Sequence, residues 1–148
     1  MTELRRAGPA DAAAIAALSR EAYAKWVPLI GRAPKPMAAD YDVAVRDHLI
    51  DLLEIEGELV ALVECIREPD HLLIENLAVA PAHQGKGHGH RLMAHVEALA
   101  RTLGLGEVRL YTNKLFAENV AFYRKLGYRV DGESAYKGGF IVHMSRRL

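Results

Sequence analysis

The sequence predicts a single α/β (α+β) domain with a mixed, mostly antiparallel central sheet and helices on both of its faces. The chain has 148 residues, which suits one domain, and 51% of them are hydrophobic, which is enough to bury a core. Strand-like segments occur first as hairpins and then as a strand–helix–strand unit, which adds a parallel pair to an otherwise antiparallel sheet. No repeat, low-complexity stretch or long linker divides the chain, so residues 1–148 are expected to form one domain.

The first half of the chain predicts a strand, two helices and a hairpin. Pro9 suits the first turn of a helix, because its missing N–H has no partner there. Gly57 lies between two apolar runs and is typical of a hairpin turn. The expected segments are a strand at Leu4–Ala7, a helix from Pro9, an ordered Pro-rich loop at Val27–Met37, a helix at Ala38–His48 and hairpin strands at Leu52–Ile55 and Leu59–Ile66.

The second half predicts the strand–helix–strand unit, another helix and a final hairpin. Leucine and valine recur at helical spacing after the glycine-rich stretch, and Gly104 ends that helix. Gly127 ends the next helix in the same way. The expected segments are a strand at Leu72–Val79, a helix containing Leu92 to Leu103, a strand at Glu107–Thr112, a helix at Ala117–Leu126 and strands at Tyr128–Val130 and Phe140–Met144.

Composition argues against several classes of protein. The 19 Lys and Arg residues balance the 19 Asp and Glu residues, so the chain lacks the basic footprint of a nucleic-acid-binding protein. Cys65 is the one cysteine, which excludes an internal disulfide and permits a reducing compartment. No secretory leader follows Met1, and no apolar run approaches the roughly 20 residues that span a bilayer. These observations predict a cytoplasmic protein without membrane or nucleic-acid partners.

The most informative stretch is the turn Gln84–Gly89, which holds three glycines at alternate positions between a strand and an amphipathic helix. Glycines let the backbone bend tightly and approach a ligand closely. Free N–H groups at a helix N-terminus bind phosphate-like anions, and Lys86 adds a charge nearby. The spacing fits neither a Walker loop nor a Rossmann fingerprint. A purely structural tight turn remains the alternative.

Gln84-Gly85-Lys86-Gly87-His88-Gly89 resembles the Q/R-x-x-G-x-G/A motif of the GCN5-related N-acetyltransferase (GNAT) superfamily. The preceding Leu77–Pro81 is similar to the strand of that family. Leu110–Asn113 and Glu118–Tyr128 are similar to the late strand and helix of the family. The resemblance covers Leu72 to Tyr128, and the first 70 residues match only in their expected order of elements.

The resemblance implies a GNAT-type sheet in which a parallel strand pair splays apart and acetyl-CoA, as acyl donor, lies in the gap. The pantetheine arm would pair with the main chain of one strand, and the pyrophosphate would lie on the amides of the glycine-rich turn. The implied cofactor-binding residues are Leu77, Ala78, Val79, Gln84, Gly85, Lys86, Gly87, His88, Gly89, Asn113, Asn119 and Tyr123.

The resemblance also implies catalytic residues. Tyr123 matches the frequent general acid of the family, and a phenol near the sulfur can protonate a departing thiolate. Simple packing of Tyr123 in the core is the alternative. Glu75, among apolar neighbours that would raise the pKa of a carboxylate, is the first candidate for the general base, and Glu64 is the second. Glu75 could equally bind the substrate cation or serve a structural partner.

The predicted function is an acyl-CoA-dependent N-acyltransferase that passes an acetyl group directly to a primary amine of a small molecule or a protein. Tyr23, Trp26 and Met37 flank the Pro-rich segment, which shapes the acceptor site in the family, and Glu75 completes the expected substrate-binding set. The alternative for the aromatic residues is a core cap or a dimer contact, and the resemblance is compatible with a homodimer. The alternative for the whole chain is a non-catalytic acyl-CoA-binding or sensory module.

Two further readings of the sequence are weaker. Four histidines crowd the region of the glycine-rich turn, at His83, His88, His90 and His95, but no metal-binding signature joins them, so no metal is expected. Cys65 lies in an apolar strand, where a lone cysteine is usually a packing residue. Direct transfer to an amine needs no covalent enzyme intermediate, so no nucleophilic role is assigned to Cys65.

Overall fold

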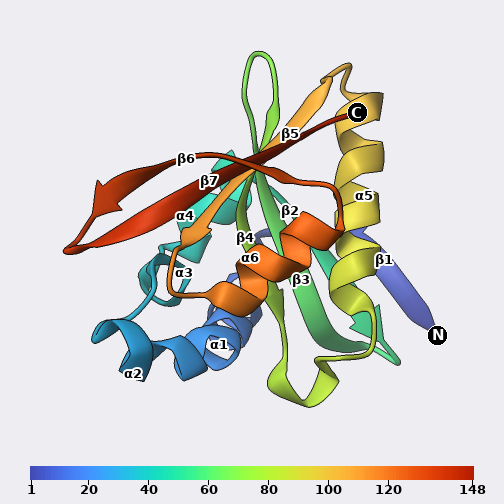
Figure 1. Ribbon diagram of the computed structural model, residues 1–148. Coiled ribbons are helices and arrows are strands. Elements are labelled where there is room, and N and C mark those ends of the chain that lie inside the picture. Colours follow the sequence, from blue (N-terminus) through green and yellow to red (C-terminus); the bar gives the residue numbers. More distant parts are fainter.

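Seven strands form one sheet in the computed structural model, which describes residues 1–148 (Figure 1). The strand order is β1-β2-β3-β4-β5-β7-β6, and β4 and β5 are its one parallel pair. The strands are β1 (Thr2–Arg6), β2 (Leu49–Ile55), β3 (Glu58–Arg67), β4 (Leu72–Val79), β5 (Glu107–Asn113), β6 (Arg129–Tyr136) and β7 (Gly139–Arg147). The predicted mixed, mostly antiparallel sheet is therefore confirmed.

The helices lie on both faces of this sheet, and none is long and apolar enough to cross a bilayer (Figure 1). Short 3-10 turns at Pro9–Asp11, Ala24–Trp26 and Pro81–His83 connect them to their neighbours. The α-helices are α1 (Ala12–Tyr23), α2 (Val27–Ile30), α3 (Lys35–Ala38), α4 (Tyr41–Asp47), α5 (His88–Thr102) and α6 (Ala117–Lys125).

Alternation along the central strands divides the core between the two faces. Leu53 and Val63 face the cluster built with α5 and α6, whereas their neighbours Leu52 and Leu62 face the cluster built with α1 and α4. Successive side chains of a strand point to opposite faces, so strands covered on both sides read as continuous apolar runs. The interior of the sheet is thus packed on both faces, and the candidate site lies where the sheet opens.

The opening is the split between β4 and β5. These strands pair only from Leu72 to Ile74; beyond that point β4 continues beside β3, and β5 continues beside β7. The pairing of β3 with β4 also shifts register at this point, because Ile74 faces Cys65 while Asn76 faces Glu64. Glu75 is therefore the extra residue of a β-bulge, a feature that bends a strand and re-aims its side chains.

The ends of β1, β2 and β7 lie up to three residues from those predicted, and three other elements need a larger correction. The Pro-rich loop Val27–Met37 contains two short helices, because α2 occupies its start and α3 begins at Lys35. The helix expected at Ala38–His48 begins at Tyr41, since the Asp40 carboxylate accepts the first free N–H groups and caps it. The strand expected at Tyr128–Val130 extends to Tyr136; it is an exposed edge strand, so it lacks the apolar alternation that marks a covered strand.

Candidate active site

The turn between β4 and α5 presents a row of free backbone N–H groups. Gly85 and Gly87 adopt left-handed conformations, with φ of 76° and 87°, and no other part of the protein lies within 4 Å of a Cβ placed on either. None of the N–H groups from Gly85 to His90 donates a hydrogen bond within the protein, whereas that of Gln84 lies 3.4 Å from the Pro81 carbonyl. Six consecutive backbone N–H groups, from Gly85 to His90, are thus available to an anion at the N-terminus of α5.

A cavity, here called the donor cavity, joins this turn to the split in the sheet. It is lined by the end of β4, the glycine-rich turn, the 3-10 turn at Ala24–Trp26 and α6. The Ala80 N–H bonds to β3, so by alternation the polar groups of Ala78 face β3 and those of Leu77 and Val79 face the open side. The Leu77 and Val79 carbonyls accept hydrogen bonds there from the Tyr23 hydroxyl and the Gln84 side chain. An exposed strand edge therefore lines the donor cavity.

A second cavity, here called the acceptor cavity, lies between the split strands, α3 and the β6–β7 hairpin. Its empty volume is about 680 Å³, part of it open to solvent, which suits a small molecule or the end of a chain. Tyr23, Leu77, Asn119 and Tyr123 line both cavities. Because these four residues are shared, a ligand extended along the donor cavity reaches the acceptor cavity at Tyr123.

The two tyrosines at this junction differ in their hydrogen bonds. The Tyr23 hydroxyl lies 2.9 Å from Asn76 Oδ1 and 3.1 Å from the Leu77 carbonyl, so its proton is already committed. The Tyr123 side chain is buried, but its hydroxyl donates no hydrogen bond within the protein. Burial raises the pKa of Tyr123 above its ordinary value, which keeps the phenol protonated. Tyr123 therefore has a proton to give.

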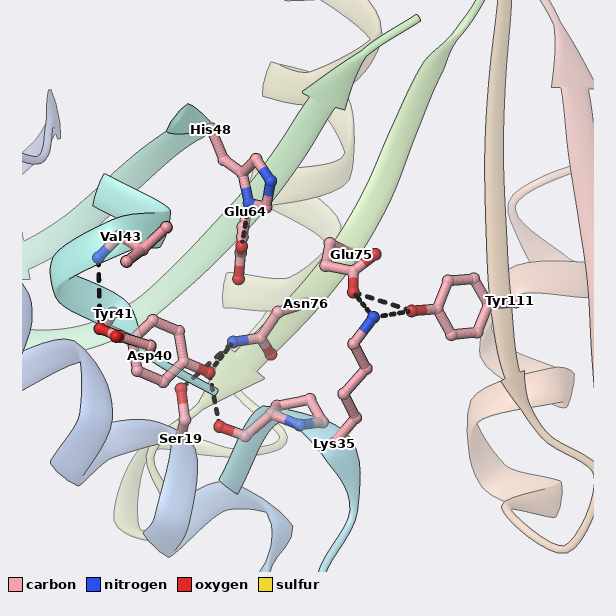
Figure 2. Close-up of polar contacts among 11 residues, drawn as sticks. Ser19, Lys35, Asp40, Tyr41, Val43, His48, Glu64, Glu75, Asn76 and Tyr111 are labelled. Carbon is pink, nitrogen blue, oxygen red and sulfur yellow. Dashed lines mark hydrogen bonds and ion pairs between the residues drawn. The ribbon is translucent and has the colours of Figure 1, made fainter. Parts of the chain in front are cut away.

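Glu75 lies in the acceptor cavity, where the bulge directs it toward Lys35 of α3 and Tyr111 of β5 (Figure 2). Its Oε1 lies 2.5 Å from Lys35 Nζ and accepts a 2.9 Å hydrogen bond from the Tyr111 hydroxyl. The hydrogen bond to Glu75 raises the pKa of Lys35, and burial together with the carboxylate raises the pKa of Tyr111 to about 12. The expected apolar setting of Glu75 is thus wrong, because an ammonium and a phenol surround the carboxylate.

Glu64, the second candidate base, lies outside the acceptor cavity. It is 3% exposed, and His48 Nδ1 lies 2.6 Å from its carboxylate (Figure 2). Burial raises the pKa of Glu64, and the hydrogen bond from His48 offsets part of that rise. On the same side of the sheet the Asn76 amide donates to Ser19 and Tyr41, which ties β4 to α1 and α4. These contacts support the strand that carries Glu75.

The remaining predicted residues divide between the two cavities. Asn119 lines both, and its side chain makes no hydrogen bond within the protein. Asn113 lines the acceptor cavity, but its Oδ1 already accepts from the Leu115 N–H. Trp26 lines the donor cavity and stacks on Phe116 at 4.3 Å between ring centroids. Met37 lines neither cavity.

The histidines and the lysine in and around the glycine-rich turn do not all line the donor cavity. His83, His88 and His90 line the donor cavity, whereas Lys86 does not. His95 instead lies 2.7 Å from the Asp51 carboxylate. No group of three or more His, Cys, Asp or Glu side chains is arranged to hold a metal ion.

Among the residues of the acceptor cavity that sequence reasoning missed, three matter most for its chemistry: Lys35, Tyr111 and Arg32. Tyr111 stands in the late strand, and strand alternation gives it the same side as Asn113, which was a usable signal. Nothing local in the Pro-rich segment shows that Lys35 reaches across to Glu75. Cys65 is fully buried, and burial raises the pKa of its thiol, so it is a packing residue.

A sheet that splits at its one parallel pair, with free amides at one end of the split and a protonated phenol at its middle, defines the class of protein: an acetyltransferase fold. Comparison with known families gives the same result. The model of the acetyltransferase (GNAT) family matches residues 15–128, so the chain belongs to this family.

Three relatives illustrate the match. Streptothricin acetyltransferase of Streptomyces lavendulae is 38% identical over 69 residues, which are 45% of this chain and 36% of that protein. 5-NmdU N-acetyltransferase of Pseudomonas phage PaMx11 is 34% identical over 96 residues, 63% of this chain and 66% of that protein. The crystal structure of PaiA N-acetyltransferase from Thermoplasma acidophilum in complex with coenzyme A covers 100% of this chain and 99% of its own, with a TM-score of 0.81 and 20% identity.

The sequence relatives and the structural match support different conclusions. The chain spans 36% and 66% of the lengths of the two curated relatives. The acceptors for which those proteins are named are therefore not assigned to this chain. The structural match extends over the whole chain, but at 20% identity it shows the fold alone. The assignment of individual residues therefore depends on the geometry of the two cavities.

Proposed function

We propose that this chain is an acyl-CoA-dependent N-acetyltransferase that passes the acetyl group of acetyl-CoA directly to a primary amine. The row of free amides from Gly85 to His90 is the observation that supports this proposal most strongly, because it faces the end of a split sheet. The residues present fit the donor: the turn offers N–H groups to a pyrophosphate, and the open edge of β4 offers main-chain groups to a pantetheine arm. When bound, acetyl-CoA would supply the activated acyl carbon.

The residues of the chain would then divide the proton transfers between them. Glu75 accepts the proton that the acceptor amine loses, while Lys35 and Tyr111 fix the position of its carboxylate. Tyr123 donates a proton to the sulfur as the thiol leaves. A C–N bond forms, the C–S bond breaks, and the products are an amide and a thiol. Leu77 and Asn119, at the junction, orient the reacting end of the donor.

The acceptor is a primary amine of a small molecule or a protein; relatives named for streptothricin and for 5-NmdU show that it varies among similar proteins. Balanced charge supports an enzyme without a nucleic-acid partner, and the single cysteine is compatible with a reducing, cytoplasmic compartment. One chain forms both cavities, so the function needs no second subunit and is compatible with a monomer or a homodimer.

Two measurements test the function. Titration calorimetry should detect binding of acetyl-CoA at micromolar concentrations, and absence of binding at high micromolar concentration would refute the proposal. Thiol release should then be followed with a panel of amines that includes polyamines, aminoglycosides, amino acids and peptides with free N-termini. Tight binding without thiol release from any amine would instead favour a sensory module that retains acyl-CoA.

A further inference from the structure

The charges that line the acceptor cavity do not cancel. Three charged side chains line it: Arg32, Lys35 and Glu75. Lys35 and Glu75 neutralise each other through their ion pair. Arg32 has no carboxylate within 4 Å; of the other twelve arginines six form ion pairs and six do not, but Arg32 is the one arginine that lines the acceptor cavity. One positive charge of the cavity is therefore left without a counter-charge.

Arg32 is also held in place without using its hydrogen-bond donors. It follows Gly31, which ends α2 in a left-handed conformation with φ of 73°. Its guanidinium carbon lies 5.4 Å from the centroid of the Tyr136 ring, on the hairpin that forms the far wall of the cavity. The side chain makes no hydrogen bond within the protein, so all five N–H donors remain available at a half-buried site. An aromatic ring that orients a guanidinium and leaves its edge free is suited to binding an anion.

We infer that the acceptor carries a carboxylate as well as its amine, and that Arg32 binds this carboxylate. The inference rests on the proposed function and names the substrate class of the same cavity. The planar fork of a guanidinium matches a carboxylate with two parallel hydrogen bonds. Glu75 lines the same cavity as Arg32, so one small molecule with both groups would have its carboxylate at Arg32 and its amine available to Glu75. The acceptor is then a small amino-acid-like molecule, whose carboxylate is unchanged while its amine is acetylated.

The same charges disfavour polycationic acceptors. A polyamine or an aminoglycoside would bring further positive charge next to an uncompensated guanidinium and a neutralised Lys35–Glu75 pair, and like charges in a partly desolvated cavity repel. The aromatic and apolar walls of the cavity, which include Phe116 and Ile141, offer such a molecule no second carboxylate. The cavity therefore selects for a negative group as well as for an amine.

The test compares amino acids of different chain length with their own carboxamides, by thiol release at saturating acetyl-CoA. For the best acceptor, kcat/KM of the acid should exceed that of its carboxamide by roughly 10-fold or more, mostly through KM, as expected for a charge-assisted bidentate contact. Arg32→Gln should lower kcat/KM for the acid far more than kcat/KM for the carboxamide, and so remove this preference. Arg32→Lys should keep part of it, because the charge remains but the fork is lost. Arg20→Gln, at an exposed arginine of α1 outside both cavities, is the matched control and should keep the full preference.

Three results would overturn the inference: no acid acetylated, a polyamine or a carboxamide preferred over every acid, or a preference that survives in Arg32→Gln. Acetylation of any other amine in those experiments would leave the proposed function intact. Failure of the function itself is recognised separately, because neither acetyl-CoA binding nor thiol release would then be seen. The comparison of acid with amide uses the wild-type protein, so it stands even if a variant does not fold.

Discussion

The donor cavity and the acceptor cavity meet at Tyr123 but are built in different ways. The donor cavity presents backbone: free amides from Gly85 to His90 and the open edge of β4. The acceptor cavity presents side chains from segments far apart in the chain, since Lys35 and Tyr111 are 76 residues apart and Tyr111 and Glu75 are 36 apart. One chain can thus bind a common donor through local backbone geometry and select its acceptor through side chains that only the fold brings together.

The two cavities should therefore respond to different substitutions. Backbone contacts tolerate changes of side chain but fail when the chain conformation changes. Contacts made by charged side chains fail when one group is removed, even if the backbone is intact.

Replacing Tyr123 by Phe should have the largest effect, because Tyr123 belongs to both cavities. Loss of the proton donor should lower kcat roughly 100-fold or more, while acetyl-CoA affinity changes little. Steady-state kinetics and calorimetry measure the two quantities. Tyr128→Phe is the matched control: Tyr128 is equally buried, but its hydroxyl donates to Glu97 outside both cavities. That variant should lose about 1–3 kcal/mol of stability and keep its kcat. Unchanged turnover in Tyr123→Phe would remove Tyr123 from the mechanism.

Replacing Glu75 by Gln tests the acceptor cavity alone. If its carboxylate accepts the proton of the amine, kcat should fall roughly 100-fold, with acetyl-CoA affinity unchanged. Glu64→Gln provides the comparison, because Glu64 is buried beside His48 and lies outside the acceptor cavity. That variant should affect the thermal midpoint of unfolding more than turnover. The opposite result, with Glu64→Gln inactive and Glu75→Gln active, would assign the role of general base to Glu64.

Replacing Gly87 by Val tests the donor cavity alone. A β-branched residue at φ of 87° is strained by about 1–3 kcal/mol, so acetyl-CoA should bind roughly 10- to 100-fold more weakly. Gly104→Val carries similar strain, at φ of 75° after the end of α5, but lies outside both cavities. It should lower stability by a similar amount and leave acetyl-CoA affinity unchanged. Equal affinity in both variants would show that the free amides do not hold the donor.

The dependence of the rate on pH should show the smallest effect. Burial raises the pKa of Tyr123, so the phenol stays protonated until the pH exceeds its ordinary value of about 10. Proton donation should consequently not limit kcat between about pH 7 and pH 9. A pH–rate profile at saturating acetyl-CoA checks this. A decline in kcat with an apparent pKa near 8 that disappears in Tyr123→Phe would contradict the assignment.

Much of the fold and the donor cavity could be predicted from the sequence. The strand Leu72–Val79 has the predicted bounds, and the turn Gln84–Gly89 joins it to α5 as expected. Predictions were poorer where local signals are weak. The exposed edge strand β6 lacks alternation, and the prolines between Val27 and Met37 mask two short helices. The bulge at Glu75 and the contact with Lys35 leave no local pattern, so the surroundings of Glu75 were predicted wrongly.

By itself the sequence determined the conformation of the donor turn and the family to which the chain belongs. Alternating glycines restrict how the backbone between β4 and α5 can bend, and that restriction acts within a few residues. The tertiary structure alone decided that Lys35 neutralises Glu75 and that Arg32 remains unpaired in the acceptor cavity. Such contacts form only after the sheet and its helices have packed, because they depend on distances between segments that are remote in the chain.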